Sequence, residues 1–259
     1  MSTYYLQFVL KSDATFGRGD GVAGDVDAEV MHDEWGLPYL GGRAIKGLLV
    51  NECADILAAL PDGESKKPWT AAAGRLFGRP GSLSADQAAW SLGDAQLPED
   101  VRTTVMRETL DTIRRRWEER PAEEKKRWEE ASADEKKREK RAFILRQKAL
   151  LRAETLETLT TTRHQTAMEA SGVPKEHSLR VQRVVLRETP FEARLESGSA
   201  EETDLGLLAA CMKAFRRAGT VKNRGRGLLE AVLLDEQRRP AGESAYKKFK
   251  TAFGAGEPA

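Results

Sequence analysis

The chain has 259 residues, 40% hydrophobic and 32% charged, and its 42 basic and 41 acidic side chains leave a formal net charge of +1. This length fits one sizeable core, or one core with an insertion. The balanced charge excludes a global attraction to nucleic acid, so any such binding has to come from local clusters. The sequence has no apolar run long enough to span a bilayer and no signal-peptide pattern at its start, so we expect a cytoplasmic protein without membrane contact.

Alternating apolar side chains over residues 4–10 predict a strand. The loop after it is rich in glycine, and Gly19, Gly21 and Gly24 have the Gly-x-Gly-x-x-Gly spacing of a dinucleotide-binding loop. That motif requires a helix directly after the glycines. Residues 25–30 alternate as in a strand instead, so we reject a dinucleotide site.

Three acidic residues, Asp25, Asp27 and Glu29, follow at intervals of two. In an extended segment all three side chains project from one face. Such a group of carboxylates fits a metal site or an acid–base site, and it fits a solvated strand face as well. The pattern alone leaves both interpretations open.

Apolar residues recur at helical spacing over residues 43–60 and predict a helix that Pro61 ends. A helix N-terminus attracts phosphate groups, so Gly42 and Arg43 are candidates for contact with a polyanion. Lys46 lies in the first turns, where a cation is unfavourable to the helix dipole. We expect Lys46 to have an anionic partner, and a solvated lysine is the alternative.

The middle of the chain changes character. Residues 101–158 are crowded with Lys, Arg and Glu, which predicts long exposed helices interrupted near Pro121 and inserted into the core fold. The charge fits a role in solubility, and a contact with RNA or protein is the alternative. The threonine-rich stretch 160–169, before Gly172 and Pro174, predicts an exposed hairpin.

The last third contains two predicted strands, over residues 181–186 and 191–195, and a helix that Asp204 caps. A second glycine-rich loop precedes an apolar run at 228–234, which predicts a central strand. Arginine forks match phosphate geometry, and glycines let backbone amides approach it. The loop is therefore a candidate phosphate site, with a solvated turn as the alternative, and it contains Lys222, Arg224, Gly225, Arg226 and Gly227.

One long motif joins these features. It comprises an Asp before an apolar pair, then Gly-x-Pro-Tyr-hydrophobic, then Gly-x-x-hydrophobic-Lys-Gly, in the residues Asp27, Val30-Met31, Gly36-Leu37-Pro38-Tyr39-Leu40 and Gly42-Arg43-Ala44-Ile45-Lys46-Gly47. This motif resembles the N-terminal region of CRISPR-associated RAMP proteins, especially the backbone subunits of type III effector complexes. The loop at 222–228 is similar to the Arg/Gly-rich loop of the same family.

The resemblance implies an α+β fold with a ferredoxin-like (RRM-like) core, which the order of predicted elements also suits. A single RAMP domain would cover residues 1–259, with a long charged helical insertion at 101–158 and a thumb-like hairpin. On that thumb Met168 would act as an apolar wedge between nucleotides. The implied partners are guide (CRISPR) RNA, target RNA, further copies of the chain and other RAMP subunits.

The implied activity is cleavage of target RNA paired with the guide. Asp27 would be the catalytic residue and a ligand of a divalent metal, with magnesium expected. The residues expected to bind RNA are Gly19, Gly21, Gly42, Arg43, Lys46, Met168, Lys222, Arg224, Gly225, Arg226 and Gly227.

Three alternatives remain at this stage. A RAMP subunit that binds guide RNA without cutting shares the fold, although Asp27 argues against it, because such subunits usually lack an Asp there. A guide-processing RAMP endonuclease would use a histidine base, and His32, His164 and His177 lie in no pattern that indicates one. A helical scaffold led by the insertion would leave both glycine-rich loops without a role.

Overall fold

The strand predicted at residues 4–10 is central to a four-stranded sheet in the computed structural model, which describes residues 2–78, 88–198 and 201–251. All neighbouring strands are antiparallel. The α+β prediction is therefore confirmed. The strand order is β2-β5-β1-β6, with β1 at Ser2–Leu10, β2 at Trp90–Leu92, β5 at Pro190–Ser197 and β6 at Leu229–Leu234.

The expectation of a central strand at 228–234 is wrong, because β6 lies at the edge of the sheet. Along most of β6 the apolar run is buried on one face only, and Leu234 at its end is buried as well. Leu229 and Leu233 face the core, whereas the side chain of Val232 is 38% exposed. A run of apolar residues therefore did not distinguish a strand covered on both faces from an edge strand.

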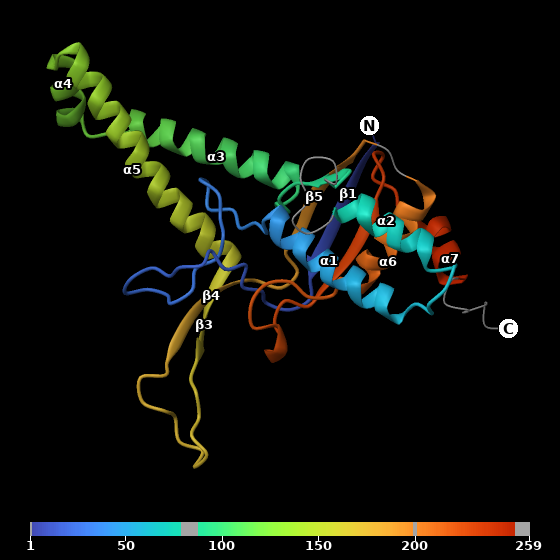
Figure 1. Cartoon of the computed structure of the whole chain (residues 1–259). Coiled ribbons are helices and arrows are strands. Elements are labelled where there is room, and N and C mark those ends of the chain that lie inside the picture. Colours follow the sequence, from blue (N-terminus) through green and yellow to red (C-terminus); the bar gives the residue numbers. More distant parts are fainter. Residues whose placement is uncertain (1, 79–87, 199–200, 252–259) are drawn as a thin grey trace.

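Four helices cover one face of the sheet, where Leu6, Phe8 and Leu10 of β1 are buried (Figure 1). Phe8 stacks on Phe191 of β5, with ring centroids 5.2 Å apart. Helix α1 confirms the helix predicted at residues 43–60, and its glycine start packs against the end of β2. The covering helices are α1 (Gly42–Ala59), α2 (Lys67–Phe77), α6 (Glu202–Ala214) and α7 (Glu243–Thr251).

Asp204 is not the cap that the sequence predicts. Helix α6 begins one turn earlier, with Glu201 at the capping position, and Asp204 is buried in the first turn. Its carboxylate accepts hydrogen bonds from Arg75, including one of 2.7 Å. Asp204 therefore links α6 to α2 through an ion pair in which the carboxylate is buried and the Arg75 side chain is 35% exposed.

A helical arm projects from the body between β2 and β5 (Figure 1). The predicted interruption is confirmed, because α3 (Glu99–Glu118) ends shortly before Pro121 and α4 (Ala122–Glu130) starts after it. Helix α5 (Ala133–Leu159) then returns to the body. Whether residues 101–158 form a separable insertion stays a prediction. Within the described residues, none of the helices is long and apolar enough to cross a bilayer.

The arm has a small aromatic cluster at its tip. The Trp117 ring lies edge-on to Trp128 and Phe143, at centroid distances of 5.7 and 5.0 Å, and the Arg120 guanidinium lies 3.1 Å above Trp117. Near the base, Leu156 of α5 belongs to the main core instead. The tip is thus a satellite cluster that is separate from the core of the body.

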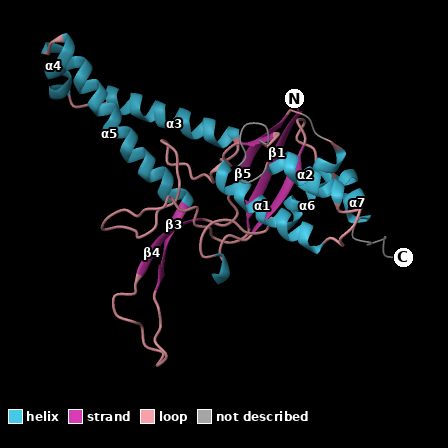
Figure 2. Cartoon of the chain, in the orientation of Figure 1, coloured by secondary structure: helices cyan, strands magenta, loops and turns pink. Residues whose placement is uncertain are grey.

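The predicted hairpin is present as a second sheet of two strands, β3 (Thr160–Gln165) and β4 (Arg180–Val185), set apart from the main sheet (Figure 2). Helix α5 runs directly into β3, so the arm and the hairpin are continuous in the chain. Met168 lies in the connection between the strands with 58% of its side chain exposed. Its role as a wedge stays a prediction.

Replacing residues 117–146 with a short Gly-Ser linker should leave a cooperatively folding body. Arg116 hydrogen-bonds Gln147 at 2.7 Å, so the linker joins two ends that already lie together, and the aromatic tip leaves as one unit. We expect the melting temperature to change by less than about 5 °C in thermal unfolding. As a control, Leu156→Ala should cost about 2–5 kcal/mol, because it opens a cavity in the main core. Non-cooperative unfolding of the truncated chain would show that the tip supports the body.

Candidate nucleic-acid interface

The acidic segment lies along the hairpin strand β4. The Asp27 amide donates to the Val181 carbonyl at 2.8 Å, the Arg183 amide donates to the Ala28 carbonyl at 3.0 Å, and Ala28 forms an isolated parallel bridge with Gln182. The regular strand expected over residues 25–30 is replaced by a tight turn and isolated bridges. The segment is nevertheless fixed, because its backbone is bonded to β4.

Two of the three carboxylates meet at one guanidinium. Arg183 is within 3.0 Å of Asp25 through Nη2 and within 3.0 Å of Glu29 through Nε. The Glu29 side chain is 4% exposed and that of Arg183 is 11% exposed, so this pair is largely removed from water. Asp25 and Glu29 are therefore counter-ions of Arg183, and the shared carboxylate face expected from the sequence is divided between different partners.

Asp27 has its own partners. Its Oδ2 accepts a hydrogen bond of 2.7 Å from the Val181 amide, and its Oδ1 lies 3.8 Å from the Arg180 guanidinium. The Asp27 side chain is 46% exposed. Asp27 is therefore held in place by β4, but unlike the other two carboxylates it is not paired with Arg183 and stays partly exposed.

The chain itself offers few ligands for a metal ion at this site. No group of three or more His, Cys, Asp or Glu side chains within the described ranges is arranged to hold a metal ion. Magnesium is commonly bound by one or two carboxylates together with phosphate oxygens of a substrate. Asp27 fits one such ligand, and the remaining ligands would be oxygens of RNA and water.

The Arg/Gly loop also contacts β4. Arg226 Nη1 donates to Gln182 Oε1 at 3.0 Å, and Gln182 is the residue that bridges Ala28. Gly227 has a φ of +70°, and a Cβ there would lie 1.9 Å from the Ala218 carbonyl oxygen, so no other residue fits this turn. Gln182 of β4 thus contacts both the Asp27 segment and the predicted phosphate loop.

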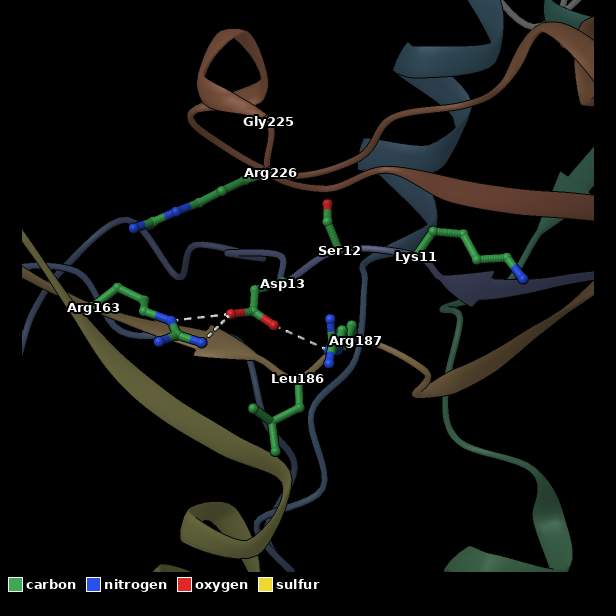
Figure 3. A pocket seen from close by; sticks show the side chains of 8 residues that line it. All are labelled: Lys11, Ser12, Asp13, Arg163, Leu186, Arg187, Gly225 and Arg226. Carbon is green, nitrogen blue, oxygen red and sulfur yellow. Dashed lines mark hydrogen bonds and ion pairs between the residues drawn. The ribbon is translucent and has the colours of Figure 1, made fainter.

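A basic pocket of about 580 Å³ opens beside this row (Figure 3). Asp13 lies within it and accepts hydrogen bonds from Arg163 Nη2 at 2.7 Å and from the Arg187 amide at 3.2 Å. The sequence predicts only two of its residues, Gly225 and Arg226. The others come from segments that are distant in the sequence, and only the fold brings them together. The pocket is lined by Lys11, Ser12, Asp13, Arg163, Leu186, Arg187, Gly225 and Arg226.

The charges around Arg226 favour an anion. Burial lowers the pKa of the Arg226 guanidinium, Asp13 raises it, and the neighbouring cations Arg163 and Arg224 lower it. A lowered pKa records that the positive charge of Arg226 is destabilised where it stands. A phosphate placed beside it would relieve part of that cost.

The start of α1 differs from its prediction. The Gly42 amide donates to Asp94 Oδ1 at 2.8 Å, and a Cβ on Gly42 would lie 2.4 Å from the Leu92 carbonyl oxygen. Gly42 is therefore a buried packing position whose amide is already bound within the chain, and its assignment to RNA binding stays a prediction. Arg43 is exposed, and Lys46 has no acidic partner among the described residues, contrary to expectation.

The other predicted RNA-binding residues fall in different places. Gly21 lies against its own segment, since a Cβ there would be 2.2 Å from the Val26 carbonyl oxygen, whereas Gly19 has open space around it. Lys222 begins a short 3₁₀ turn, Lys222–Arg224, in the Arg/Gly loop. The structure thus brings the Arg/Gly loop and Asp27 to β4, and leaves the α1 start and Met168 apart from them.

Solved structures of a CRISPR complex contain chains of the same fold. A chain of the type III-B Cmr-beta complex bound to cognate target RNA matches at a TM-score of 0.56 and 11% identity, over 90% of this chain and 97% of that one. A chain of the Cmr-beta apo state matches at 0.57 and 10%, over 91% and 98%. No family model and no curated protein matches the sequence.

At these identities the likeness shows the fold alone. The chain has the fold of the matched chains of the type III-B Cmr-beta complex, which agrees with the fold that the resemblance of the Asp27 to Gly47 motif implies.

Arg183→Ala should destabilise the chain by about 3–5 kcal/mol, because it leaves the buried Glu29 carboxylate without its cation. Arg180→Ala is the matched control on the same strand. Its side chain is 63% exposed, so its loose pair with Asp27 should contribute less than about 1 kcal/mol. Urea unfolding of both variants measures the difference, and equal stabilities would show that the acidic segment does not depend on Arg183.

Proposed function

We propose that this chain is an RNA-binding backbone subunit of a type III CRISPR effector complex, with a ferredoxin-like core. The two connections β1–α1–β2 and β5–α6–β6 and the order β2-β5-β1-β6 support that core, because a β-α-β-β-α-β chain gives interleaved strands. The observation that carries the proposal is the convergence of the Asp27 segment and Arg226 on β4, in a chain whose fold matches Cmr-beta.

The Arg/Gly loop is the proposed contact with the guide backbone. Arg224 is exposed, and Gly225 has open space around it. Among the described residues, the Arg226 guanidinium is paired only with the neutral side chain of Gln182. Guanidinium groups free of acidic partners can bind phosphate oxygens through paired hydrogen bonds. Because phosphates carry no sequence information, this contact would hold any guide.

Asp27 is the proposed catalytic residue for cleavage of target RNA. β4 fixes Oδ2 through the Val181 amide and leaves the side chain partly exposed, which suits a group that orients a 2′-hydroxyl or binds a divalent ion. Magnesium, when bound, would stabilise charge on the phosphate. The residues of the chain would position the RNA and hold Asp27 in register with it.

Assembly is the remaining part of the proposal. The hairpin, with Met168 exposed beyond its strands, and the arm both project from the body, where they are accessible to RNA, to other copies and to other RAMP subunits (Figure 1). Wedging by Met168 would displace a nucleotide at a cost of a few kcal/mol of stacking.

A subunit that binds RNA without cleaving it is the second candidate. It is favoured by the occupation of Asp25 and Glu29 by Arg183, which leaves Asp27 as a single carboxylate. Both candidates require the same RNA contacts and differ only in the role of Asp27.

Changing Arg224 and Arg226 together to Ala should weaken RNA binding regardless of sequence. The slope of log affinity against log salt should fall by about one to one and a half, because each lost phosphate contact on single-stranded RNA removes about 0.7. Lys125→Ala with Lys126→Ala, two exposed cations of α4 at the arm tip, removes the same charge elsewhere and should leave the slope unchanged. Equal slopes in all three proteins would refute the loop contact.

Asp27→Asn should retain folding and RNA binding, because the amide oxygen can still accept the Val181 hydrogen bond. In the assembled complex it should lower the rate of target cleavage by about 100-fold or more. The measurement is cleavage of a labelled, guide-complementary RNA with and without magnesium. Asp25→Asn is the matched control and should stay near the wild-type rate. Full activity of Asp27→Asn would remove the catalytic assignment, and an inactive wild type with every divalent ion would favour the second candidate.

A further inference from the structure

The basic pocket differs from the other predicted contacts because three separate segments build it (Figure 3). The loop after β1 contributes Asp13, the base of the hairpin contributes Arg163 and Arg187, and the Arg/Gly loop contributes Arg226. Three guanidinium groups therefore lie around a single carboxylate. The pocket retains an excess of positive charge in a chain that is nearly neutral as a whole.

Asp13 holds these segments together before any ligand arrives. Its carboxylate binds Arg163 and the Arg187 amide, and its backbone carbonyl accepts a hydrogen bond of 2.9 Å from Gly227. The Asp13 side chain is 18% exposed, so it forms the inner wall of the pocket. A pocket formed in advance loses little conformational entropy when it binds.

The guanidinium of Arg187 has no hydrogen-bond or ion-pair partner among the described residues. Arg187 contacts Asp13 through its backbone amide instead. Within the part of the chain that the structure describes, the Arg226 guanidinium hydrogen-bonds only the neutral Gln182. Lys11 differs from both, because Glu230 neutralises it at 2.9 Å. Two uncompensated forks, Arg187 and Arg226, therefore remain for an anion.

We propose that this pocket binds the sugar–phosphate backbone of single-stranded RNA, with Arg187 as its principal free contact and Asp13 as the residue that positions its walls. This inference rests on the proposed RNA-binding function and extends it to residues outside the Arg/Gly loop. The volume of about 580 Å³ exceeds that of a single phosphate and lies in the range of ligand pockets, about 300–1,000 Å³.

The lining also selects the backbone over the bases. Proteins that grip bases on single strands use aromatic side chains as stacking platforms. None of the lining residues is aromatic, and Leu186 is the only one with an aliphatic side chain. A ligand held by guanidinium groups without stacking is read by its phosphates, so binding here is independent of sequence.

The test is fluorescence anisotropy of the full-length chain with two labelled single-stranded RNAs, one of uridine only and one of mixed sequence. Each would be about 20 nucleotides, longer than the sites of about 4–16 nucleotides that single-strand-binding folds cover. Arg187→Ala should raise Kd about tenfold near 0.1 M salt for both RNAs and reduce the salt slope by about 0.7. Arg187→Lys keeps the charge but loses the fork, so its Kd should fall between those of the wild type and Arg187→Ala.

Lys247→Ala is the matched control, since Lys247 is an exposed cation of α7 without an ion pair among the described residues. It should bind both RNAs like the wild type. If Arg187→Ala and Lys247→Ala change Kd equally while the wild type binds RNA, the pocket assignment is overturned and the proposed function stands. A loss of affinity confined to one of the two RNAs would overturn the assignment to the backbone. A wild type that binds neither RNA would overturn the proposed function together with the pocket.

Discussion

The guanidinium of Arg183 joins the loop after β1 to the hairpin, and the geometry of the interface follows from that bond. By binding Asp25 and the buried Glu29 together, it sets the acidic segment along β4. That register leaves Asp27 on the Val181 amide and places Ala28 beside Gln182. Burying the Arg183–Glu29 pair costs free energy of desolvation. Removing one partner costs more, because the other would remain as an uncompensated buried charge.

Asp13 plays a corresponding part in the basic pocket. It lies in the loop directly after β1, and its hydrogen bonds reach both the base of the hairpin and the Arg/Gly loop. A chain with a net charge of +1 thereby obtains a local concentration of positive charge. The nearby acidic residues Asp25 and Glu29 do not cancel that charge, since both are paired with Arg183. Lys11 is paired with Glu230, whereas the Arg187 guanidinium has no ion-pair partner among the described residues.

The sequence predicts the elements whose signals are local. Periodicity identifies β1 and α1, and the composition of 222–228 identifies the Arg/Gly loop. It fails where a partner is distant in the chain. The Asp94 carboxylate that occupies the Gly42 amide is 52 positions away, and Arg183 is 154 positions from Glu29. Arg187 has no local signal, because an isolated arginine after a strand resembles any solvated one. Such residues acquire a role only when topology brings them together.

The central claim is that RNA binds where β4, the end of β1 and the Arg/Gly loop meet. Hydrogen exchange of the full-length chain, with and without single-stranded RNA, tests it most directly, since bound backbone amides become protected. The account predicts added protection at residues 11–13, 180–187 and 222–228, with α2 and α7 unchanged. Protection centred on α2 and α7, or no change in the presence of RNA that binds, would contradict it.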